Sequence, residues 1–357
     1  MTAFTGLQVR RVSETNKNVL KLLKDFYEFE LDDNSPTVLV LKDMASYTEW
    51  NVPEEEDARK FIRNKLQTLP GVKRVREKIV VERRNETKEA VDYEMPDVDR
   101  SKVYMHDLEV AIHYTLRKEV SGVEYIQGRY LQALKDFVAA LIKYFPGRPP
   151  VMKFLTRINK SIKDLLVTNM LVWGTWQEIL EKADETKGAY LTRNETYYGC
   201  SGSQPDLRGF PCSLWQLFHV LVNQAYKIEP EGEWGVGMLI NMKEYIARYF
   251  SCMECRKHWA IATDDIEEID GSEDSIMYLW SKHNKVNLRL SGGKNDDPEF
   301  PKVQWPTREI CPECWNEHLE FDETKVFQFL VDFYSPANIS EDFVEDVKPV
   351  PRPSDEL

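Results

Sequence analysis

Two cysteines three positions apart could carry redox chemistry or hold a metal ion. Cys252 and Cys255 stand in the stretch YFSCMECRKHW, residues 249–259, at the end of an apolar helical run. A Cys-x-x-Cys pair can cycle between dithiol and disulfide, or it can bind zinc when a second pair of ligands converges on it. The pair alone leaves both alternatives open.

The remaining cysteines also fall into local pairs. The chain has six cysteines, all beyond Gly199, and the other pairs are Cys200 with Cys212 and Cys311 with Cys314. An even number in local pairs indicates disulfides, which persist in oxidising compartments. A zinc site is not required, because the two Cys-x-x-Cys pairs are far apart in the sequence, unlike those of a zinc ribbon or finger.

In the redox interpretation, Cys252 and Cys255 lie where one helix ends and RKHWAIA, residues 256–262, can begin another. The positive end of a helix dipole lowers the pKa of a thiol, and the neighbouring Arg256 and Lys257 add to this effect. Thiols react slowly with oxygen, so the electrons of a dithiol need a cofactor as their acceptor. A redox pair here therefore implies a cofactor pocket nearby.

Two further helical segments place aromatic and imidazole side chains on one face each. Trp215 and His219 are four residues apart. The segment 275–290 presents an indole, an imidazole and two amides at spacings of three and four: Trp280, His283, Asn284 and Asn287. The alternative interpretations are a buried core histidine, a hydrogen-bonded helix interface and, for His258, a surface residue. Together, such helices could clamp a flat amphipathic ring, such as an isoalloxazine or an adenine, by stacking and edge hydrogen bonds.

The elements that must position these side chains change in type along the chain. Residues 6–12 and 37–41 are β-rich, and residues 18–26 and 53–66 have helical spacing, which predicts a short α/β unit ending near Gly71. Residues 82–101 are charged and lack apolar periodicity, so they are predicted to be a linker.

The rest of the chain is predicted to be a helical bundle. Residues 103–184 carry apolar side chains at helical spacing throughout, with PGRPP as a stop within them. Four further helices are predicted, over residues 213–226, 237–250, 275–290 and 323–334. The acidic, proline-rich residues 341–357 are predicted to be a solvated tail.

Composition and charge argue against several classes of protein. With 357 residues, of which 42% are hydrophobic and 30% charged, the chain fits two globular domains. A net charge of -13 argues against a nucleic-acid partner, and no stretch approaches the ~20 apolar residues of a membrane span. The first residues lack the apolar region of a signal peptide. Sequons at Asn85, Asn159, Asn194 and Asn338 are compatible with a glycoprotein.

Five motifs in order carry a resemblance to a known family. They are YYGCSGSQPDLRGFPCSLWQLFHVLVNQA, CMECRKHW, LWSKHNKVNLRLSGG, DPEFPKVQWP and CPECW, and together they resemble the flavin-binding Erv-type domain of the quiescin sulfhydryl oxidases. Upstream, YMHDLEVAIHYTLRKEV and LKDFVAALIKYFPGRP are similar to the helix-rich region of that family, a degenerate copy of the Erv fold without flavin. The opening GLQVRRV through SPTVLVLKD is similar to the end of its second thioredoxin-like domain.

The resemblance implies a mainly α fold. An Erv-type helical bundle that binds FAD is expected to pack with a degenerate helical pseudo-Erv domain, preceded by a small α/β thioredoxin-like fragment. The implied boundaries are 1–81 for the thioredoxin-like segment, 82–101 for the linker, 102–190 for the pseudo-Erv domain, 191–340 for the Erv-type domain and 341–357 for a disordered tail.

The resemblance also assigns the site residues. By position, Cys255 is the thiol beside the flavin, and Cys252 exchanges with the incoming dithiol through a mixed disulfide. Glu254 stands where related enzymes carry an aspartate. Contacts with FAD are implied for twelve residues: Arg208, Trp215, His219, Glu254, His258, Trp280, His283, Asn284, Val286, Asn287, Lys302 and Trp305.

The other two cysteine pairs are implied to be disulfides as well. The resemblance makes Cys200–Cys212 structural. Cys311–Cys314 is implied to be structural too, with an electron-shuttle role as the alternative. No metal is implied.

The implied activity is the oxidation of dithiols or protein thiols to disulfides with reduction of O2 to H2O2, in support of oxidative protein folding in the secretory pathway. No cysteine precedes Cys200, so the family's amino-terminal redox pair is lacking and small dithiols are expected to be better substrates than proteins. A monomer is expected, with the pseudo-Erv domain covering the face through which Erv bundles dimerise. The alternatives are a zinc-stabilised helical interaction module and a catalytically dead scaffold.

Overall fold

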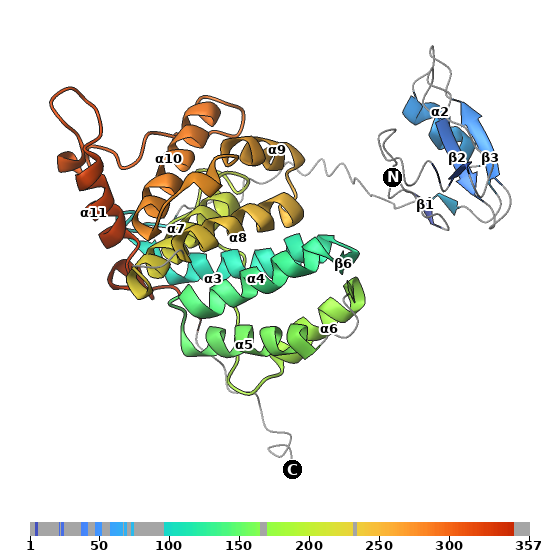
Figure 1. Cartoon of the computed structure of the whole chain (residues 1–357), viewed down its shortest axis with the longest axis horizontal. Helices are drawn as coiled ribbons and strands as arrows, with labels where there is room; N and C mark the ends of the chain where they lie inside the picture. The colour runs from blue at the N-terminus through green and yellow to red at the C-terminus, as the bar shows by residue number, and fades with distance from the viewer. Residues whose placement is uncertain are drawn as a thin grey trace. The chain divides into compact units, whose positions relative to one another are not determined.

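The computed structural model describes residues 4–5, 21, 23–24, 37–41, 47–51, 58–66, 68–69, 73–74, 96–164, 170–230 and 234–345. The chain forms two compact units, residues 1–92 and 93–357 (Figure 1).

The first unit contains two small antiparallel sheets and a helix. Strand β1 (Phe4–Thr5) pairs with β4 (Lys73–Arg74), and β2 (Thr37–Leu41) pairs with β3 (Tyr47–Asn51), which precedes helix α2 (Ala58–Leu66). The strand predicted at 37–41 is confirmed. The helix predicted over 53–66 is confirmed for its last nine residues.

Three further points concern the predictions for this unit. Strand β3 was not predicted, although the Tyr, Thr and Trp of its sequence YTEWN are residue types enriched in strands. The predicted strand over 6–12 lies outside the described residues, as does most of the predicted helix over 18–26.

The second unit begins with a helical half interrupted by a small sheet. Its helices are α3 (Met105–Tyr114), the π-helical η1 (Thr115–Glu119), the short 3-10 turn η2 (Val120–Gly122), α4 (Arg129–Tyr144), α5 (Pro149–Asp164) and α6 (Trp173–Asp184). Strand β6 (Tyr125–Gln127) pairs antiparallel with β7 (Met170–Val172). Ile126 and Leu171 point inward while their neighbours are exposed, a period of two that no helix satisfies. The prediction of helix throughout 103–184 is therefore wrong for these strands.

The second half of this unit contains the helices that carry most of the predicted site. They are α7 (Gly209–Ile228), α8 (Trp234–Tyr249), α9 (Met253–Ala262), α10 (Ser272–Leu290) and α11 (Glu323–Phe333), with short turns η4 (Ile266–Glu268), η5 (Pro312–Cys314) and η6 (Pro336–Asn338). All four helices predicted here are present, each with ends that differ by a few residues. Helix α9 begins three residues before the predicted start, directly after Cys252.

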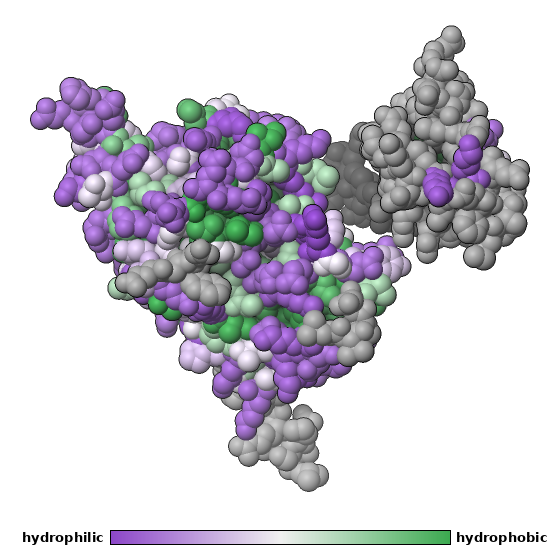
Figure 2. Space-filling view, viewed as in Figure 1, coloured by the Kyte–Doolittle hydropathy of each residue, from purple (hydrophilic) through white to green (hydrophobic). Residues whose placement is uncertain are grey.

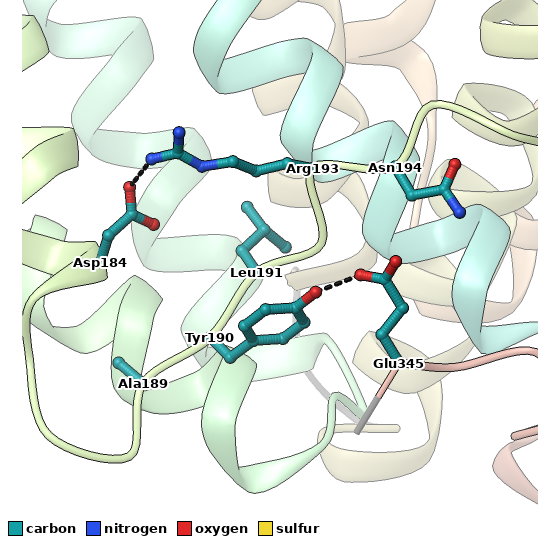
Figure 3. A pocket seen from close by; sticks show the side chains of 7 residues that line it. All are labelled: Asp184, Ala189, Tyr190, Leu191, Arg193, Asn194 and Glu345. Carbon is teal, nitrogen blue, oxygen red and sulfur yellow. Dashed lines mark hydrogen bonds and ion pairs between the residues drawn. The ribbon is translucent and has the colours of Figure 1, made fainter. Parts of the chain in front are cut away.

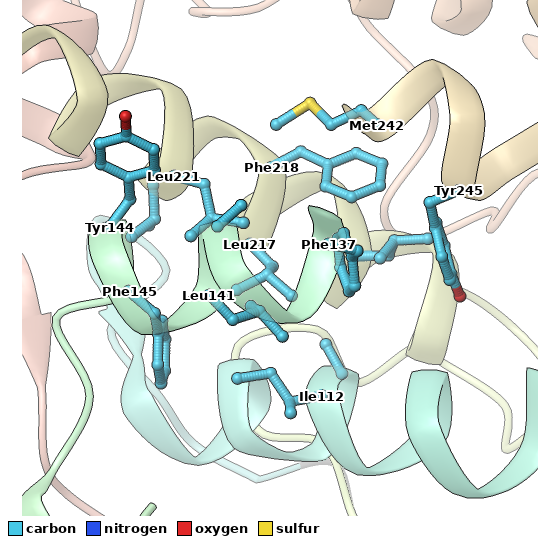
Figure 4. Close-up of a cluster of buried hydrophobic side chains, with 14 of the residues drawn as sticks. Ile112, Phe137, Leu141, Tyr144, Phe145, Leu217, Phe218, Leu221, Met242 and Tyr245 are labelled. Atoms are coloured by element: carbon cyan, nitrogen blue, oxygen red, sulfur yellow. The ribbon is translucent and has the colours of Figure 1, made fainter. Parts of the chain in front are cut away.

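The two helical halves share one hydrophobic core. Helices α3 and α4 pack against α7 and α8, and Figure 4 shows side chains from all four meeting in one cluster. The ring of Phe137 on α4 stacks on that of Tyr245 on α8, with centroids 4.6 Å apart. Because such apolar contacts exclude water from both halves at once, neither half is an independent layer.

Two buried acids on α3 each hold a different loop of this unit. The carboxylate of Asp107 accepts hydrogen bonds from the backbone N–H groups of Tyr198 (2.8 Å) and Cys200 (2.7 Å), and burial raises its pKa to about 6. Glu109 forms a two-pronged ion pair with Arg148 at 2.6 and 2.7 Å. A buried pair of this kind is costly to break, since one charge is left without compensation.

Residues 339–345 form a strap that packs against the first part of this unit. Strand β8 (Ile339–Ser340) pairs in parallel with β5 (Val103–Tyr104), and the ring of Phe343 stacks on Tyr198 at 4.0 Å. Glu345 accepts hydrogen bonds from Tyr190 and Thr192. Of the solvated tail predicted over 341–357, residues 341–343 are exposed, and Phe343 and Glu345 nevertheless make these contacts; residues 346–357 lie outside the described residues.

The strap also borders a cavity of about 300 Å³, shown in Figure 3. Arg193 pairs with Asp184 at 2.6 Å on one side of it, and Tyr190 meets Glu345 on the other. None of the residues predicted to carry redox or cofactor chemistry lines this cavity.

The visible face of the second unit is mostly hydrophilic, with small hydrophobic patches between charged side chains (Figure 2). Within the described residues, none of the helices combines the length and the apolar character needed to cross a lipid bilayer.

Candidate active site

The Cys-x-x-Cys pair lies at the amino-terminal end of α9. Cys252 is the N-cap residue and forms a disulfide with Cys255 in the first turn. Its sulfur accepts a hydrogen bond from the backbone N–H of Cys255 (3.2 Å), as an N-cap side chain does. Both cysteines are half-buried, whereas Met253 and Glu254 between them are exposed. The disulfide is thus within reach of the surface.

The local field at this disulfide favours a thiolate over a thiol. The unpaired N–H groups of the first helical turn carry partial positive charge, and Arg256 follows Cys255 directly. The guanidinium of Arg256 donates from Nε to the carbonyl of Phe250, so its charge is held at the turn that precedes Cys252. A reduced sulfur here has a stabilised anionic form.

Trp259 connects the disulfide to a cluster of rings. It lies four residues after Cys255 on α9, so the two side chains share one face of the helix. Its ring meets that of Trp215 on α7 edge to face at 5.5 Å, and Trp215 stacks on His283 of α10 with centroids 4.0 Å apart and planes 3° apart. The sequence had not singled out Trp259 for the site, although its spacing from Cys255 was a usable signal.

Two neutral histidines form the centre of this cluster. Nε2 of His219 and Nδ1 of His283 are 3.1 Å apart. Burial, with a smaller contribution from His283, holds the pKa of His219 well below its usual value, and burial lowers the pKa of His283 to about 3. One imidazole therefore donates and the other accepts. Tyr334, at the end of α11, stacks on His219 at 4.6 Å; no spacing signal in the sequence points to it.

Three of the predicted side chains on α10 bond to the chain itself. Trp280 Nε1 donates to the carbonyl of Trp305 (2.5 Å), and Asn284 both donates to that carbonyl and accepts from the N–H of Trp305, each at 2.8 Å. Asn287 donates to the carbonyl of Val303 (3.0 Å). The hydrogen-bonded helix interface, the alternative interpretation, describes these three, while His283 faces the ring cluster.

The two predicted basic residues lie on loops and helix ends. Arg208 is the N-cap of α7 with a positive φ of 61°, and its guanidinium lies over the ring of Phe300 at 4.8 Å. Burial lowers its pKa to about 10, so it is charged at neutral pH. It also lines a cavity of about 280 Å³. Lys302 donates to the carbonyl of Asn295 (3.1 Å) and to Asp296 (3.3 Å).

The remaining predicted residues lie at the margin. Glu254 and His258 approach within 3.6 Å on one face of α9, and the side chain of Glu254 is 83% exposed. Val286 is half-buried on α10. The structure therefore brings Trp215, His219 and His283 together but leaves Glu254 facing solvent.

The ring cluster suits a flat cofactor with polar edges. Among the described residues, several buried polar atoms have no hydrogen-bond partner, and one of them, Trp259 Nε1, belongs to the ring cluster. Buried polar groups almost always have partners, so this indole N–H is available to a polar ligand or water. Stacked rings with a free edge donor fit an isoalloxazine.

The other disulfides have structural surroundings. Cys200–Cys212 ties the segment before α7 to its first turn. Cys311–Cys314 joins two side chains that are 1% and 0% exposed. All six cysteine sulfurs are thus in disulfides, and no group of His, Cys, Asp and Glu in the described part of the chain is arranged to hold a metal ion.

Comparison with known proteins gives two family matches along the second unit. Residues 99–203 match the family described as flavin adenine dinucleotide (FAD)-dependent sulfhydryl oxidase, and residues 212–306 match the Erv1/Alr family. The two matches follow one another along the chain, and each covers one of the two helical halves.

Similar proteins carry related names. Sulfhydryl oxidase 1 of Homo sapiens is 38% identical over 350 residues, covering 95% of this chain and 45% of the human protein. Sulfhydryl oxidase 1 of Gallus gallus is 36% identical over 327 residues (90% and 43%), and Sulfhydryl oxidase 2 of Homo sapiens is 35% identical over 300 residues (81% and 42%). This chain therefore spans less than half the length of these relatives.

A solved structure agrees with these matches. The sulfhydryl oxidase fragment of human QSOX1 is 41% identical, with a TM-score of 0.64, and the match covers 68% of this chain and 99% of that one. The mainly helical fold and the family predicted from the motifs are thereby confirmed. The chain belongs to the quiescin sulfhydryl oxidase family, whose members are FAD-dependent.

Proposed function

We propose that this chain is a FAD-dependent dithiol oxidase in which Cys252–Cys255 is the redox disulfide. The observation that carries the proposal is the position of this disulfide, at the amino-terminal end of α9 and one helical turn before Trp259, whose ring meets that of Trp215, which in turn stacks on His283. A zinc module is less well supported, because every cysteine sulfur is already bonded to another sulfur.

The thiol–disulfide steps use only the two cysteines. An incoming thiolate attacks Sγ of Cys252, the Cys252–Cys255 bond breaks, and Cys255 leaves as a thiolate. The second substrate thiol then attacks the mixed disulfide, so that the substrate leaves oxidised and both cysteines are reduced. Two electrons and the protons of two thiols have then been transferred from the substrate. FAD, when bound, would supply the acceptor for these two electrons, and O2 with two protons would be the final acceptor, giving H2O2.

The assignment of the two sulfurs follows from the helix. Cys255 shares a face of α9 with Trp259 and hence with the ring cluster, which favours it as the sulfur next to the cofactor. Cys252, at the N-cap, is then the sulfur that meets substrate. The N–H of Cys255 and the helix dipole stabilise negative charge on it, which makes it a good leaving group in the second exchange.

The other predicted site residues take distinct roles in the proposal. Trp215, His219 and His283 would hold the flavin ring, and Trp280, Asn284 and Asn287 would fix the segment of residues 303–305 beside it. Arg208 and Lys302 would neutralise the pyrophosphate, since both are cationic and lie near helix or loop ends. Glu254 and His258 would contact the cofactor only at the rim. Val286 would contribute apolar contact.

The experiment that tests the function is the visible spectrum of the purified chain with an assay of peroxide production. A flavin spectrum and peroxide formed with dithiothreitol support the proposal, whereas a colourless protein refutes it. Cys255→Ser should leave the flavin content unchanged and abolish turnover. Peroxide production that survives in this variant would remove Cys255 from the mechanism.

Cys252→Ser is the matched control for the assignment of the two sulfurs. It too should abolish turnover. Each variant keeps one thiol of the pair, and the rate at which iodoacetamide alkylates that thiol measures its accessibility. Cys252 in the Cys255→Ser variant should be alkylated faster than Cys255 in the Cys252→Ser variant. The opposite order would exchange the two roles.

The wider organisation is also part of the proposal. Residues 1–81 would be a thioredoxin-like remnant and 82–101 a linker, 102–190 the pseudo-Erv domain and 191–340 the Erv-type domain. The packing of α3 and α4 over α7 and α8 supports a monomer, because the face used for pairing is covered within one chain. The molar mass in solution, measured by light scattering, tests this. A dimer that persists on dilution would contradict it.

The substrates and the compartment follow from the same chemistry. Reduced dithiols or protein thiols would be oxidised, and O2 would be the final acceptor. Three disulfides and the sequons at Asn159 and Asn194 support a place in the secretory pathway. The third described sequon is less suited to a glycan, because the amide of Asn338 already donates to the carbonyls of Ser101 and Phe333.

A further inference from the structure

A buried carboxylate from the first helical half reaches the loop that carries the redox disulfide. Glu119 ends η1 and is only 5% exposed. One of its carboxylate oxygens accepts a hydrogen bond from the hydroxyl of Ser251 (3.0 Å), the residue directly before Cys252. The other oxygen, Oε2, is buried and has no hydrogen-bond partner within the described residues. A carboxylate with an unsatisfied oxygen is costly to bury.

The surroundings of Glu119 contain one opposite charge. The ionisable groups that face it are Tyr114 at the end of α3, Tyr245 on α8 and Arg256 on α9. Burial raises the pKa of Glu119, while the hydrogen bonds from Ser251 and the charge of Arg256 act in the opposite direction. The carboxylate is thus held against the turn of residues 250–252.

Arg256 holds the same turn by two further hydrogen bonds. Its backbone N–H donates to the carbonyl of Cys252 (3.0 Å), and its guanidinium donates to the carbonyl of Phe250. The turn that bears Cys252 is therefore held both by an anion supplied by the first helical half and by a cation supplied by α9. Their charges act on the sulfurs with opposite signs.

We propose that Glu119 is a positioning residue that, through Ser251, lowers the reduction potential of the Cys252–Cys255 couple. The helix-rich half of the chain would then tune the chemistry of the other half. This inference rests on the proposed function for its purpose, but the potential of the couple exists whether or not the chain turns over.

The sign follows from the charge of each state. Reduction adds two electrons and two protons to the disulfide and yields two thiols, one of which readily ionises at a helix N-terminus. A neighbouring carboxylate destabilises that thiolate and offsets the charge of Arg256, so it disfavours the reduced form. Replacing the carboxylate with a neutral amide should favour the reduced form and make the couple more oxidising.

The test measures the couple directly. The full chain is equilibrated without oxygen in dithiothreitol redox buffers, quenched by alkylation and digested with trypsin. Both cysteines then fall in one peptide, residues 249–256, between Arg248 and Arg256. Glu119→Gln should shift the equilibrium about tenfold toward the reduced form, which for two electrons is about 30 mV. Glu124→Gln, an exposed glutamate in the same region, is the matched control and should leave the equilibrium unchanged.

The dependence on pH separates a charge effect from a structural one. The difference between wild type and Glu119→Gln should be present when Glu119 is ionised, and should disappear as the pH falls through its raised pKa. A purely structural role predicts equal potentials at every pH, because glutamine keeps a hydrogen-bond acceptor for Ser251. Equal potentials would overturn the inference.

A second variant keeps the test valid if Glu119→Gln does not fold. Ser251→Ala removes the hydrogen bond that favours the ionised carboxylate, so it should shift the equilibrium in the same direction by about threefold. No shift, or one toward the oxidised form, would refute the inference. A shifted potential without any peroxide production would instead leave the inference standing and count against the proposed function alone.

Discussion

His219 offers a test of the buried ring cluster through the dependence of stability on pH. Its imidazole is buried between Tyr334 and His283, and burial holds its pKa well below its usual value. The folded state therefore binds fewer protons than the unfolded state once the pH falls below the unfolded value. The free energy of unfolding should decrease over that range. His219→Gln removes the titrating group and retains an amide that can bond His283.

As long as His219 stays neutral in the folded state, the size of this decrease in unfolding free energy depends only on the pKa of His219 in the unfolded chain. With an unfolded pKa of about 6.5, protonation of the unfolded chain costs the folded state about 1.4 kcal/mol between about pH 7.5 and about pH 5.5. His283, whose pKa burial lowers to about 3, contributes with the same sign. Asp107, whose pKa burial raises to about 6, contributes with the opposite sign. The difference between wild type and variant isolates His219.

The assay is urea unfolding of both proteins at both pH values, followed by tryptophan fluorescence. Of the nine tryptophans, all but Trp50 belong to the second unit, so the signal reports mainly on the unit that holds the site. The loss of stability on acidification should be about 1.4 kcal/mol smaller in His219→Gln. His318→Gln makes the same change at the exposed surface and should alter stability by less than about 0.5 kcal/mol at either pH.

The opposite result would be informative. If wild type and His219→Gln lose the same free energy of unfolding on acidification, His219 is protonated in the folded state or exposed to water. Either outcome would refute the neutral histidine pair and remove the main support for a ring pocket.

Two further predictions concern the supports of the site. Asn284→Ala leaves the backbone N–H of Trp305 without its partner and should cost about 2 kcal/mol in the free energy of unfolding and lower the flavin content. Asn287→Ala loses a single hydrogen bond, which is more exposed to solvent, and should cost less than about 1 kcal/mol. An equal loss of unfolding free energy in the two variants would contradict this account. Phe137→Ala removes a ring that stacks on Tyr245 across the two helical halves, and should cost about 3–5 kcal/mol by calorimetry. A change under about 1 kcal/mol would mean that the halves do not share a core.

Residue spacing alone predicted a large share of the candidate site. The proximity of Cys252 to Cys255, three residues apart, and the face of α10 follow from helical periodicity, because side chains three and four residues apart lie together whatever surrounds the helix. The helices themselves follow from the same periodicity, with uncertain ends. The motifs then sufficed to identify the family.

Periodicity could not predict which side chains on this face of α10 contact the ring cluster and which bond to the backbone. The structure assigns His283 to the ring cluster and gives Asn284 to the backbone of Trp305, although the two residues are neighbours. It also pairs β6 with β7 across more than forty residues, where a three-residue run has too little sequence to reveal its period.

The sequence by itself determined the main helices of the second half and the neighbouring sulfurs of the two Cys-x-x-Cys pairs, since both depend on residues a few positions apart. Only the tertiary structure decided that Tyr334 stacks on His219, that Glu119 reaches Ser251, and that α4 covers α8. These contacts join residues about 100 or more positions apart. They depend on how whole helix faces bury apolar area against one another, and no local pattern records that choice.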